Sequence, residues 1–149
     1  MRSSAIVIVG IFIFSCTATG QESKFAPGSS PHHCSKRDEI ASEREGERLK
    51  DWTAVYHSFQ LYRQCDDGEL AEDYSDAVSI LLSEHWPSVG LLARLARSDP
   101  QFGEFVLRHA DSLMSPDQAK TIIVNAEKHC PAGARALCRR LDARVRDPF

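Results

Sequence analysis

The chain of 149 residues lacks the short motifs on which common catalytic and metal centres are built. It has no Gly-x-Ser-x-Gly, no His-Glu-x-x-His and no glycine-rich phosphate loop, so three large enzyme classes have no support. Its five cysteines include no Cys-x-x-Cys pair, which argues against a four-thiolate zinc site. We therefore predict a protein that is not an enzyme and that holds no metal or other cofactor.

Strand patterns and an excess of positive charge are missing as well. No run of alternating β-branched residues occurs, and no Asn-Gly or Asp-Gly turn stands between two such runs. The formal net charge is −3 and becomes −4 once Arg2 is removed, so nothing draws the whole chain to nucleic acid or anionic lipid. We expect the partner to be another protein, with no nucleic acid involved.

A single long apolar run is present, and it stands at the start of the chain. Residues 5–14 are uncharged and follow Arg2; as a helix they would cover about 15 Å, half of a bilayer core. This is the pattern of a secretion signal, which we place at residues 1–20. Cleavage before Gln21 gives a free periplasmic or secreted protein. The alternative is the lipobox-like segment ending at Cys16, whose lipidation would anchor the protein to the cell envelope and supply the one membrane contact that we expect.

Export changes the interpretation of the remaining cysteines, because disulfides persist outside the reducing cytosol. Cys34, Cys65, Cys130 and Cys138 allow three pairings, and we favour Cys34–Cys65 with Cys130–Cys138. Eight residues of continuous helix span about 12 Å, which is too far for a bridge. The second pairing therefore requires a bend, and the Pro131 to Gly133 segment supplies one.

The rest of the chain divides into an arm and a helical domain. Residues 21–36 are rich in Pro, Gly and Ser and predict a flexible arm or tether, whereas residues 37–149 predict the folded domain. Residues 37–50 are almost wholly polar and predict a solvated lead-in. Beyond them, apolar stripes at helical spacing and capping residues predict helix starts near positions 51, 69, 88, 100, 116 and 132. We predict an all-α, compact bundle of about five to six short antiparallel helices with two disulfides, or the same helices curved like a short solenoid.

An acidic segment is the main candidate for partner binding. It comprises Asp66, Asp67, Glu69, Glu72, Asp73 and Asp76, within eleven residues and without a Lys or Arg among them. One interpretation is structural: Asp66 or Asp67 caps a helix, and the other acids favour its positive N-terminal end. The other is functional: a negative face for a basic partner, or a weak cation site. The order of acids does not match an EF-hand loop.

Three further clusters have a plain structural explanation beside a functional one. His32-His33-Cys34 could bind copper or zinc, but only if the thiol is free. His85 and His109 fall on or near apolar stripes, where a hydrogen-bonded core histidine is expected. Four arginines near the C-terminus are predicted to share one side of a helix: Arg135, Arg139, Arg140 and Arg144. They either pair with acids elsewhere in the protein or contact anionic lipid headgroups or a docked acidic partner.

Residues 62–86 carry marks of a known kind of protein. They include Tyr62-Arg63-Gln64-Cys65-Asp66-Asp67-Gly68 and Trp86, and Cys130-Pro131 and Leu137-Cys138 follow near the end. This pattern resembles a group of small exported helical proteins of proteobacteria whose activity is unassigned. The resemblance implies an exported helical domain with paired cysteines and implies no chemistry.

Together these features predict an exported helical domain of the cell envelope that serves as a non-catalytic accessory or binding protein. The alternative is an immunity or inhibitor protein that neutralises a secreted toxin or hydrolase through the acidic face, since an acidic face speeds the capture of a basic enzyme.

Overall fold

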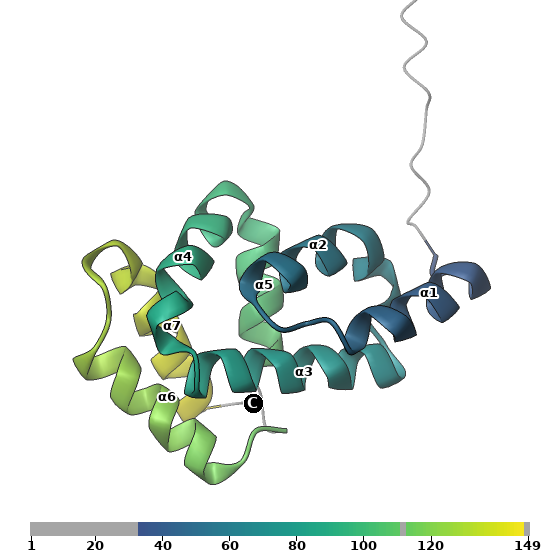
Figure 1. Ribbon diagram of the computed structural model, residues 1–149. Coiled ribbons are helices and arrows are strands. Elements are labelled where there is room, and N and C mark those ends of the chain that lie inside the picture. The colour runs from purple at the N-terminus through teal and green to yellow at the C-terminus, as the bar shows by residue number, and fades with distance from the viewer. Residues whose placement is uncertain (1–32, 111–112, 148–149) are drawn as a thin grey trace, which may run out of the picture.

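The computed structural model describes residues 33–110 and 113–147 and shows an all-α protein in this part of the chain. Figure 1 shows the seven helices α1 (Lys36–Gly46), α2 (Trp52–Tyr62), α3 (Gly68–Ser83), α4 (Val89–Ser98), α5 (Pro100–His109), α6 (Pro116–Lys128) and α7 (Arg135–Arg146). Three single-turn 3-10 helices connect them: η1 (Arg63–Cys65), η2 (Trp86–Ser88) and η3 (Ala132–Ala134). The predicted fold class is confirmed. The predicted signal, Cys16 and most of the arm lie outside the described residues.

The helix starts follow the local capping chemistry of the sequence. The Asp51 carboxylate accepts hydrogen bonds from the backbone of Thr53 and Ala54 and so begins α2. Asp99 caps α5 in the same way, with proline at the first helical position. Ser115 and Gln118 form a reciprocal capping box at the start of α6. Each of these caps satisfies backbone N–H groups that a helix leaves unpaired.

The polar lead-in is a complete helix of eleven residues, α1. Its N-cap is Ser35, whose hydroxyl accepts from the Asp38 backbone, and acids occupy its first turn, where the helix dipole favours negative charge. Ser42 is the one residue of α1 that is buried. This helix forms with almost no apolar face, and it brings the described part of the chain to seven helices where five to six were predicted.

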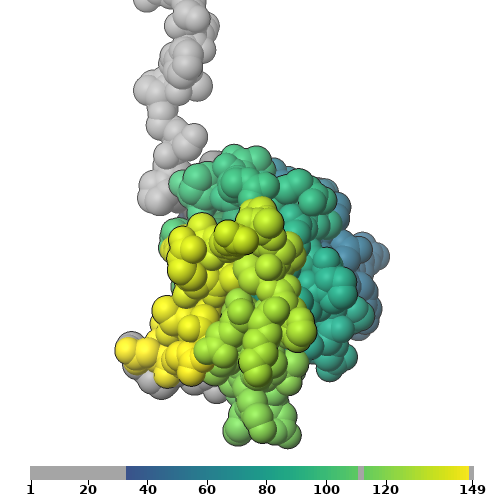
Figure 2. Space-filling model, turned by 90° about the vertical axis from the view of Figure 1, so that its left-hand side faces the viewer, coloured from purple at the N-terminus to yellow at the C-terminus, as the bar shows by residue number. Residues whose placement is uncertain are grey.

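Helix α3 is the longest of the described helices; in Figure 1 it runs beneath α2 and α5 from α1 toward α6, and it contacts α1, α5 and α6. Two pairs of consecutive helices pack together, α4 with α5 and α6 with α7. Figure 2 looks onto the end of the molecule where α6 and α7 lie side by side. In Figure 1 this end lies opposite α1.

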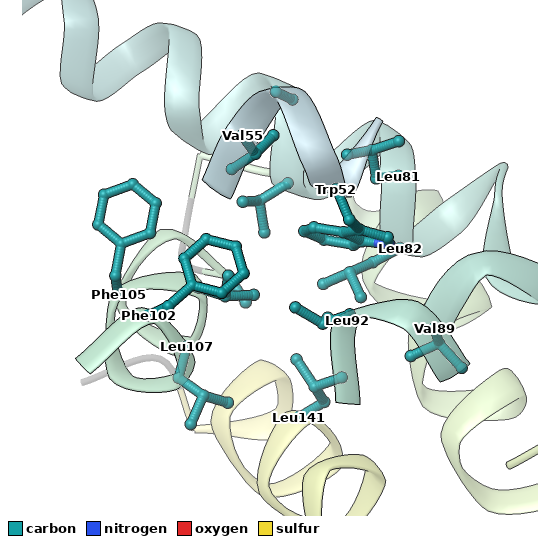
Figure 3. Packing of buried hydrophobic residues seen from close by; sticks show 14 of the residues in the cluster. Trp52, Val55, Leu81, Leu82, Val89, Leu92, Phe102, Phe105, Leu107 and Leu141 are labelled. Atoms are coloured by element: carbon teal, nitrogen blue, oxygen red, sulfur yellow. The ribbon is translucent and has the colours of Figure 1, made fainter. Parts of the chain in front are cut away.

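The core lies where α2, α3, α4, α5 and α7 converge (Figure 3). Trp52 and Val55 of α2 point toward Phe102 of α5, and Leu92 and Leu141 close the lower side of the cluster. Both buried indoles have partners: Trp52 Nε1 donates to the Ser88 hydroxyl at 2.9 Å, and Trp86 Nε1 donates to the carbonyl of His129 at 3.0 Å. Burial of large apolar side chains, each stabilising the fold by about 1.5–3 kcal/mol, holds the bundle together.

Both predicted disulfides are present. Cys34–Cys65 joins the segment before α1 to η1, with the two Cα atoms 4.8 Å apart. Cys130–Cys138 joins the α6–α7 connection to α7, with a Cα separation of 6.2 Å, because Pro131 and η3 bend the chain between them. Two disulfides fit a location outside the reducing cytosol. No helix within residues 33–110 or 113–147 has both the length and the apolar character needed to cross a membrane.

Candidate functional site

The six acidic residues singled out by the sequence lie in different environments. Asp66 turns into the protein, with 8% of its side chain exposed. Asp67 is the N-cap of α3 and, with Glu69, lines a groove against α1. Asp73 and Asp76 line a second hollow farther along α3. Glu72 is exposed. The acidic segment therefore has three roles: Asp67 caps α3, the Asp66 side chain is buried inside the protein, and the other four acids lie at the surface.

Asp66 is paired with two basic groups of α5. Arg108 Nη2 donates to Asp66 Oδ2 at 2.6 Å, and His109 Nε2 lies 3.1 Å from Oδ1 and 3.3 Å from Oδ2. Only the contact with Oδ2 has hydrogen-bond geometry, so Oδ1 is left without a hydrogen bond. Burial raises the pKa of Asp66, but the hydrogen bonds and charges of His109 and Arg108 outweigh it, and the pKa is lowered below its usual value.

The imidazole of His109 has a second polar neighbour on its other side. Nδ1 makes a 3.0 Å hydrogen bond with the Ser75 hydroxyl, and the ring packs 4.5 Å from Phe105, centroid to centroid. An Asp–His–Ser series in this order matches the groups that activate a serine nucleophile. However, Ser75 is only 2% exposed and His109 only 5%, so no substrate reaches the hydroxyl in this structure. The series is a polar part of the core.

A neighbouring pair of hydroxyl groups, from Tyr74 and Ser58, is also buried and hydrogen-bonded. The Tyr74 hydroxyl lies 2.7 Å from the Ser58 hydroxyl. Burial raises the pKa of Tyr74 to about 12, although the hydrogen bond between the two hydroxyls lowers it in part. The predicted core role of His109 is confirmed. The same prediction is wrong for His85, which is exposed because α3 ends at Ser83 and leaves it in the connection to η2.

A groove of about 590 Å³ lies between α1 and the start of α3. One wall consists of His33, Cys34, Glu39, Ser42 and Glu43, and the other of Gln64, Cys65, Asp67, Gly68, Glu69 and Leu70. The disulfide between the two walls holds them together. We call this feature the acidic groove.

Four carboxylates line the acidic groove and no Lys or Arg does so. Glu39 and Glu43 come from α1, one helical turn apart, and face Asp67 and Glu69. Lys36 lies at the edge and pairs with Glu39 at 3.0 Å, with both side chains exposed. Asp67 is partly committed to capping, since its carboxylate accepts from the backbone N–H of Gly68, which has a φ of 53°. The site is therefore negative, concave and open to solvent.

The sequence indicated only one wall of this groove. Glu39 and Glu43 belong to the polar lead-in and were not singled out. The spacing of four between them, in a segment beginning two residues after Cys34, is the signal that could have placed them opposite Asp67.

A second hollow of about 260 Å³ lies at the other end of α1, where Gly46 faces Asp73. The pKa of Asp73 is raised, first by burial and then by repulsion from Glu69, Asp76, Glu72 and Glu47. A Cβ atom on Gly46 would collide with the Asp73 carboxylate, so glycine permits this close approach of α1 to α3.

The arginines of α7 are largely used within the protein. Arg140 pairs with Glu104 of α5 at 2.6 Å, and Arg144 Nε donates to the carbonyl of Leu107 at 3.2 Å. Arg135 and Arg139 are exposed. A shallow hollow of about 510 Å³ separates α5 from α7 and is lined by Glu104, Leu107, Arg108, Arg140, Ala143 and Arg144. Of the four arginines predicted to share this side, Arg140 alone pairs with an acid among the described residues, and Arg144 binds a backbone carbonyl instead.

No metal-binding constellation is formed by the described residues, where no three His, Cys, Asp or Glu side chains gather suitably. Cys34 is committed to its disulfide, which removes the soft ligand from the His33-Cys34 pair, and His32 lies outside the described residues. Predicted site residues come together in two places: Asp67 and Glu69 in the acidic groove, and Asp73 and Asp76 in the smaller hollow; the acidic groove is the larger of the two. No protein-family model, no curated protein and no solved structure matches this chain.

Proposed function

We propose that this chain is an exported, non-catalytic binding domain whose acidic groove receives a basic segment of a partner protein. The observation that carries the proposal is the groove itself, where four carboxylates from two helices face one open space of about 590 Å³. That volume lies in the range of sites that take small ligands or a few side chains. Lysine or arginine side chains fit its charge.

The groove is arranged before any partner arrives. Its α3 wall belongs to the core through Leu70 and Tyr74, and the disulfide ties its α1 wall to η1. Binding to a surface that is already ordered costs less conformational entropy. Opposite charge across the interface raises the association rate and makes it depend on salt.

Features that indicate export support the same proposal. The pattern of residues 1–20 is that of a secretion signal, and both disulfides fit an oxidising compartment. A periplasmic or secreted protein is the form we propose, with lipid anchoring at Cys16 as the alternative. Mass spectrometry of the mature N-terminus separates the two, since lipid on Cys16 and a start at Gln21 exclude each other.

An immunity or inhibitor protein is the second candidate, and the same groove favours it. A secreted toxin or hydrolase with a basic active-site rim would present the charge that the groove accepts. The candidates differ in one measurable outcome: an inhibitor abolishes the activity of the enzyme that it captures, whereas an accessory protein leaves that activity in place.

The decisive experiment compares two variants that lose the same charge. The groove variant is Glu39→Gln/Glu43→Gln/Glu69→Gln, which spares the cap Asp67 and the buried Asp66. The control is Glu84→Gln/Asp117→Asn/Asp147→Asn, whose exposed acids do not line the groove. Binding of a heptaarginine peptide is measured by fluorescence anisotropy at low and high salt.

We expect affinity for the peptide to fall about tenfold in the groove variant and to change little in the control, with binding by the native chain lost at high salt. Equal losses in both variants would show that net charge alone attracts the peptide. That result, or an unchanged affinity in the groove variant, would overturn the proposal.

A further inference from the structure

We propose that Cys34–Cys65 is a thiol–disulfide exchange site that controls the attachment of α1, and that positively charged thiols open it in preference to negatively charged ones. The inference concerns the regulation of the acidic groove, and its meaning for partner binding rests on the proposed function. The exchange chemistry and the release of α1 depend only on the bridge and on how α1 contacts the rest of the protein.

Helix α1 lies against α2 and α3, but among the described residues no side-chain hydrogen bond or ion pair joins it to them. Its side-chain hydrogen bonds and ion pairs are all local: Ser35 with Asp38, Lys36 with Glu39, Ser42 with the Glu39 carbonyl and Arg48 with Glu45. Within the described part of the chain, none of them reaches another helix. The Cys34–Cys65 bridge is therefore the one strong link between the start of α1 and the domain.

Packing adds little to that link. Ser42 is the single buried residue of α1, and the buried apolar core begins only at Leu49, beyond the end of the helix. Isolated helices of eleven residues are marginal in water, and helices in proteins owe most of their stability to an apolar packed face, which α1 lacks. Opening the bridge therefore frees α1 while the core from Leu49 to Leu141 stays folded.

The two sulfur atoms of the bridge differ in access. Cys34 lines the acidic groove and is partly exposed, whereas Cys65 is 6% exposed against the core. An attacking thiolate reaches Cys34 Sγ, forms a mixed disulfide there and breaks the Cys34–Cys65 bond. Cys65 leaves as a thiolate and takes a proton from water.

A second thiol completes the exchange. As a thiolate it attacks the reagent sulfur of the mixed disulfide, the reagent disulfide forms, and Cys34 leaves as a thiolate that is then protonated. The two reagent thiols lose two electrons and the protein bridge gains them. Cys34 and Cys65 end as free thiols, with one wall of the acidic groove no longer fixed.

The charge around the bridge selects the reagent. Glu39, Glu43, Asp67 and Glu69 line the same groove as Cys34, with Lys36 paired to Glu39 at its edge, and their net negative charge repels a thiolate that carries a further negative charge. An ammonium group on the reagent offsets this repulsion. The second bridge provides an internal reference, because Cys130 is also partly exposed, Cys138 is buried, and their neighbours in sequence include Lys128, Arg135 and Arg139.

The first test uses the whole mature protein with both disulfides intact. Aminoethanethiol and mercaptoethanesulfonate are compared at equal thiolate concentration, and alkylation followed by peptide mass spectrometry measures the reduction of each bridge. At low ionic strength we expect the rate ratio of the cationic to the anionic thiol to be about tenfold larger at Cys34–Cys65 than at Cys130–Cys138. This difference between the rate ratios of the two bridges should shrink in about 0.5 M salt and in the variant Glu39→Gln/Glu43→Gln. Equal ratios at the two bridges would overturn the charge selection.

The second test follows α1 by hydrogen exchange in Cys34→Ala/Cys65→Ala and in protein reduced selectively at this bridge. We expect residues 36–48 to lose protection by at least about tenfold while α3, α4 and α5 keep theirs. Protection of α1 that survives in both samples would refute the clamp, as would loss of protection in α3 to α5 of the selectively reduced protein.

The heptaarginine peptide separates this inference from the proposed function. Binding to the oxidised protein that is lost after reduction supports both. Equal binding before and after reduction overturns the control of the groove and leaves the proposed function standing. Absence of binding to the oxidised protein overturns the proposed function, while the exchange rates and the release of α1 are judged on their own measurements.

Discussion

The side chain of Asp66 leaves an acidic segment and turns toward α5, where His109 and Arg108 meet it. Removing one partner of a buried, hydrogen-bonded carboxylate costs more than the contact itself contributes, because the remaining group keeps its desolvation penalty. His109 is 5% exposed and also bonds Ser75, so its loss affects two buried polar groups. We predict that His109→Ala lowers the free energy of unfolding by about 3 kcal/mol at neutral pH, measured by urea denaturation.

Arg108→Gln is the matched control, since Arg108 binds the same carboxylate from a side chain that is 61% exposed. Surface ion pairs contribute little, so we expect its loss to stay below about 1 kcal/mol. Similar losses in the two variants would mean that the burial of His109 has no energetic weight.

Asp73 lies beside four other carboxylates, and its pKa is raised by burial and by their repulsion. A carboxyl whose pKa is higher in the folded protein than in the unfolded chain destabilises the fold while it is ionised. This penalty is fully present above the folded pKa, fades as the pH falls through that value, and is gone below the ordinary value of 3.8. Asp73→Asn should therefore stabilise the protein at pH 7 by a few tenths of a kcal/mol, and the gain should vanish in acid.

Thermal and urea unfolding across the acidic range checks this prediction. Asp117→Asn serves as a control of opposite sign, because Asp117 lies in the first turn of α6, where the helix dipole favours its charge. A destabilised Asp73→Asn at neutral pH would contradict the repulsion argument.

Two helical glycines differ in the space that is available for an added side chain. In α4, a Cβ added at Gly90 meets only the end of the Arg94 side chain at 4.0 Å, whereas in α5 a Cβ at Gly103 meets the Cβ of Ala96 at 3.2 Å. Alanine favours a helix over glycine by about 0.8–1.0 kcal/mol. We predict that Gly90→Ala stabilises the protein by nearly that amount and that Gly103→Ala gains nothing or destabilises it.

The melting temperatures of the two single variants test this prediction. The difference between them measures how closely α4 and α5 approach each other. An equal gain in both would show that this interface yields without cost.

The positions of the helices can be predicted from the sequence more reliably than the directions in which individual side chains point. The caps at Asp51, Asp99 and Ser115 act within three residues, so the sequence displays both donor and acceptor and the helix starts were placed within three residues of their observed positions. The bend at Pro131 likewise made Cys130–Cys138 foreseeable. The inward turn of Asp66 depends on His109, which lies 43 residues away. The acidic groove also needs α1, whose face toward α3 is not marked by apolar residues and is indicated only by the spacing of Glu39 and Glu43 after Cys34.

At the scale of the whole molecule, charge is divided along the chain. Residues 33–85 carry thirteen acidic and six Lys or Arg side chains, whereas residues 86–149 carry seven and ten. In Figure 1 α1 and the start of α3 lie at one end, and α7 lies toward the other. The net charge of −3 thus combines an acidic part and a basic part of the chain, and neither part has that charge. A surface divided in this way orients the protein in the field of a charged partner before contact.

This division makes a prediction about the native protein. At pH 7 and low salt it should bind an anion exchanger through the α1 end, and it should also be retarded on a cation exchanger despite its negative net charge. Arg135→Glu/Arg139→Glu should abolish the retardation, because these exposed arginines have no ion-pair partner in the described part of the chain. Arg146→Gln, which removes a guanidinium already paired with Asp142 at 2.8 Å, should change it little. Elution of the native protein in the void of the cation exchanger would show that the α7 end presents no usable positive surface.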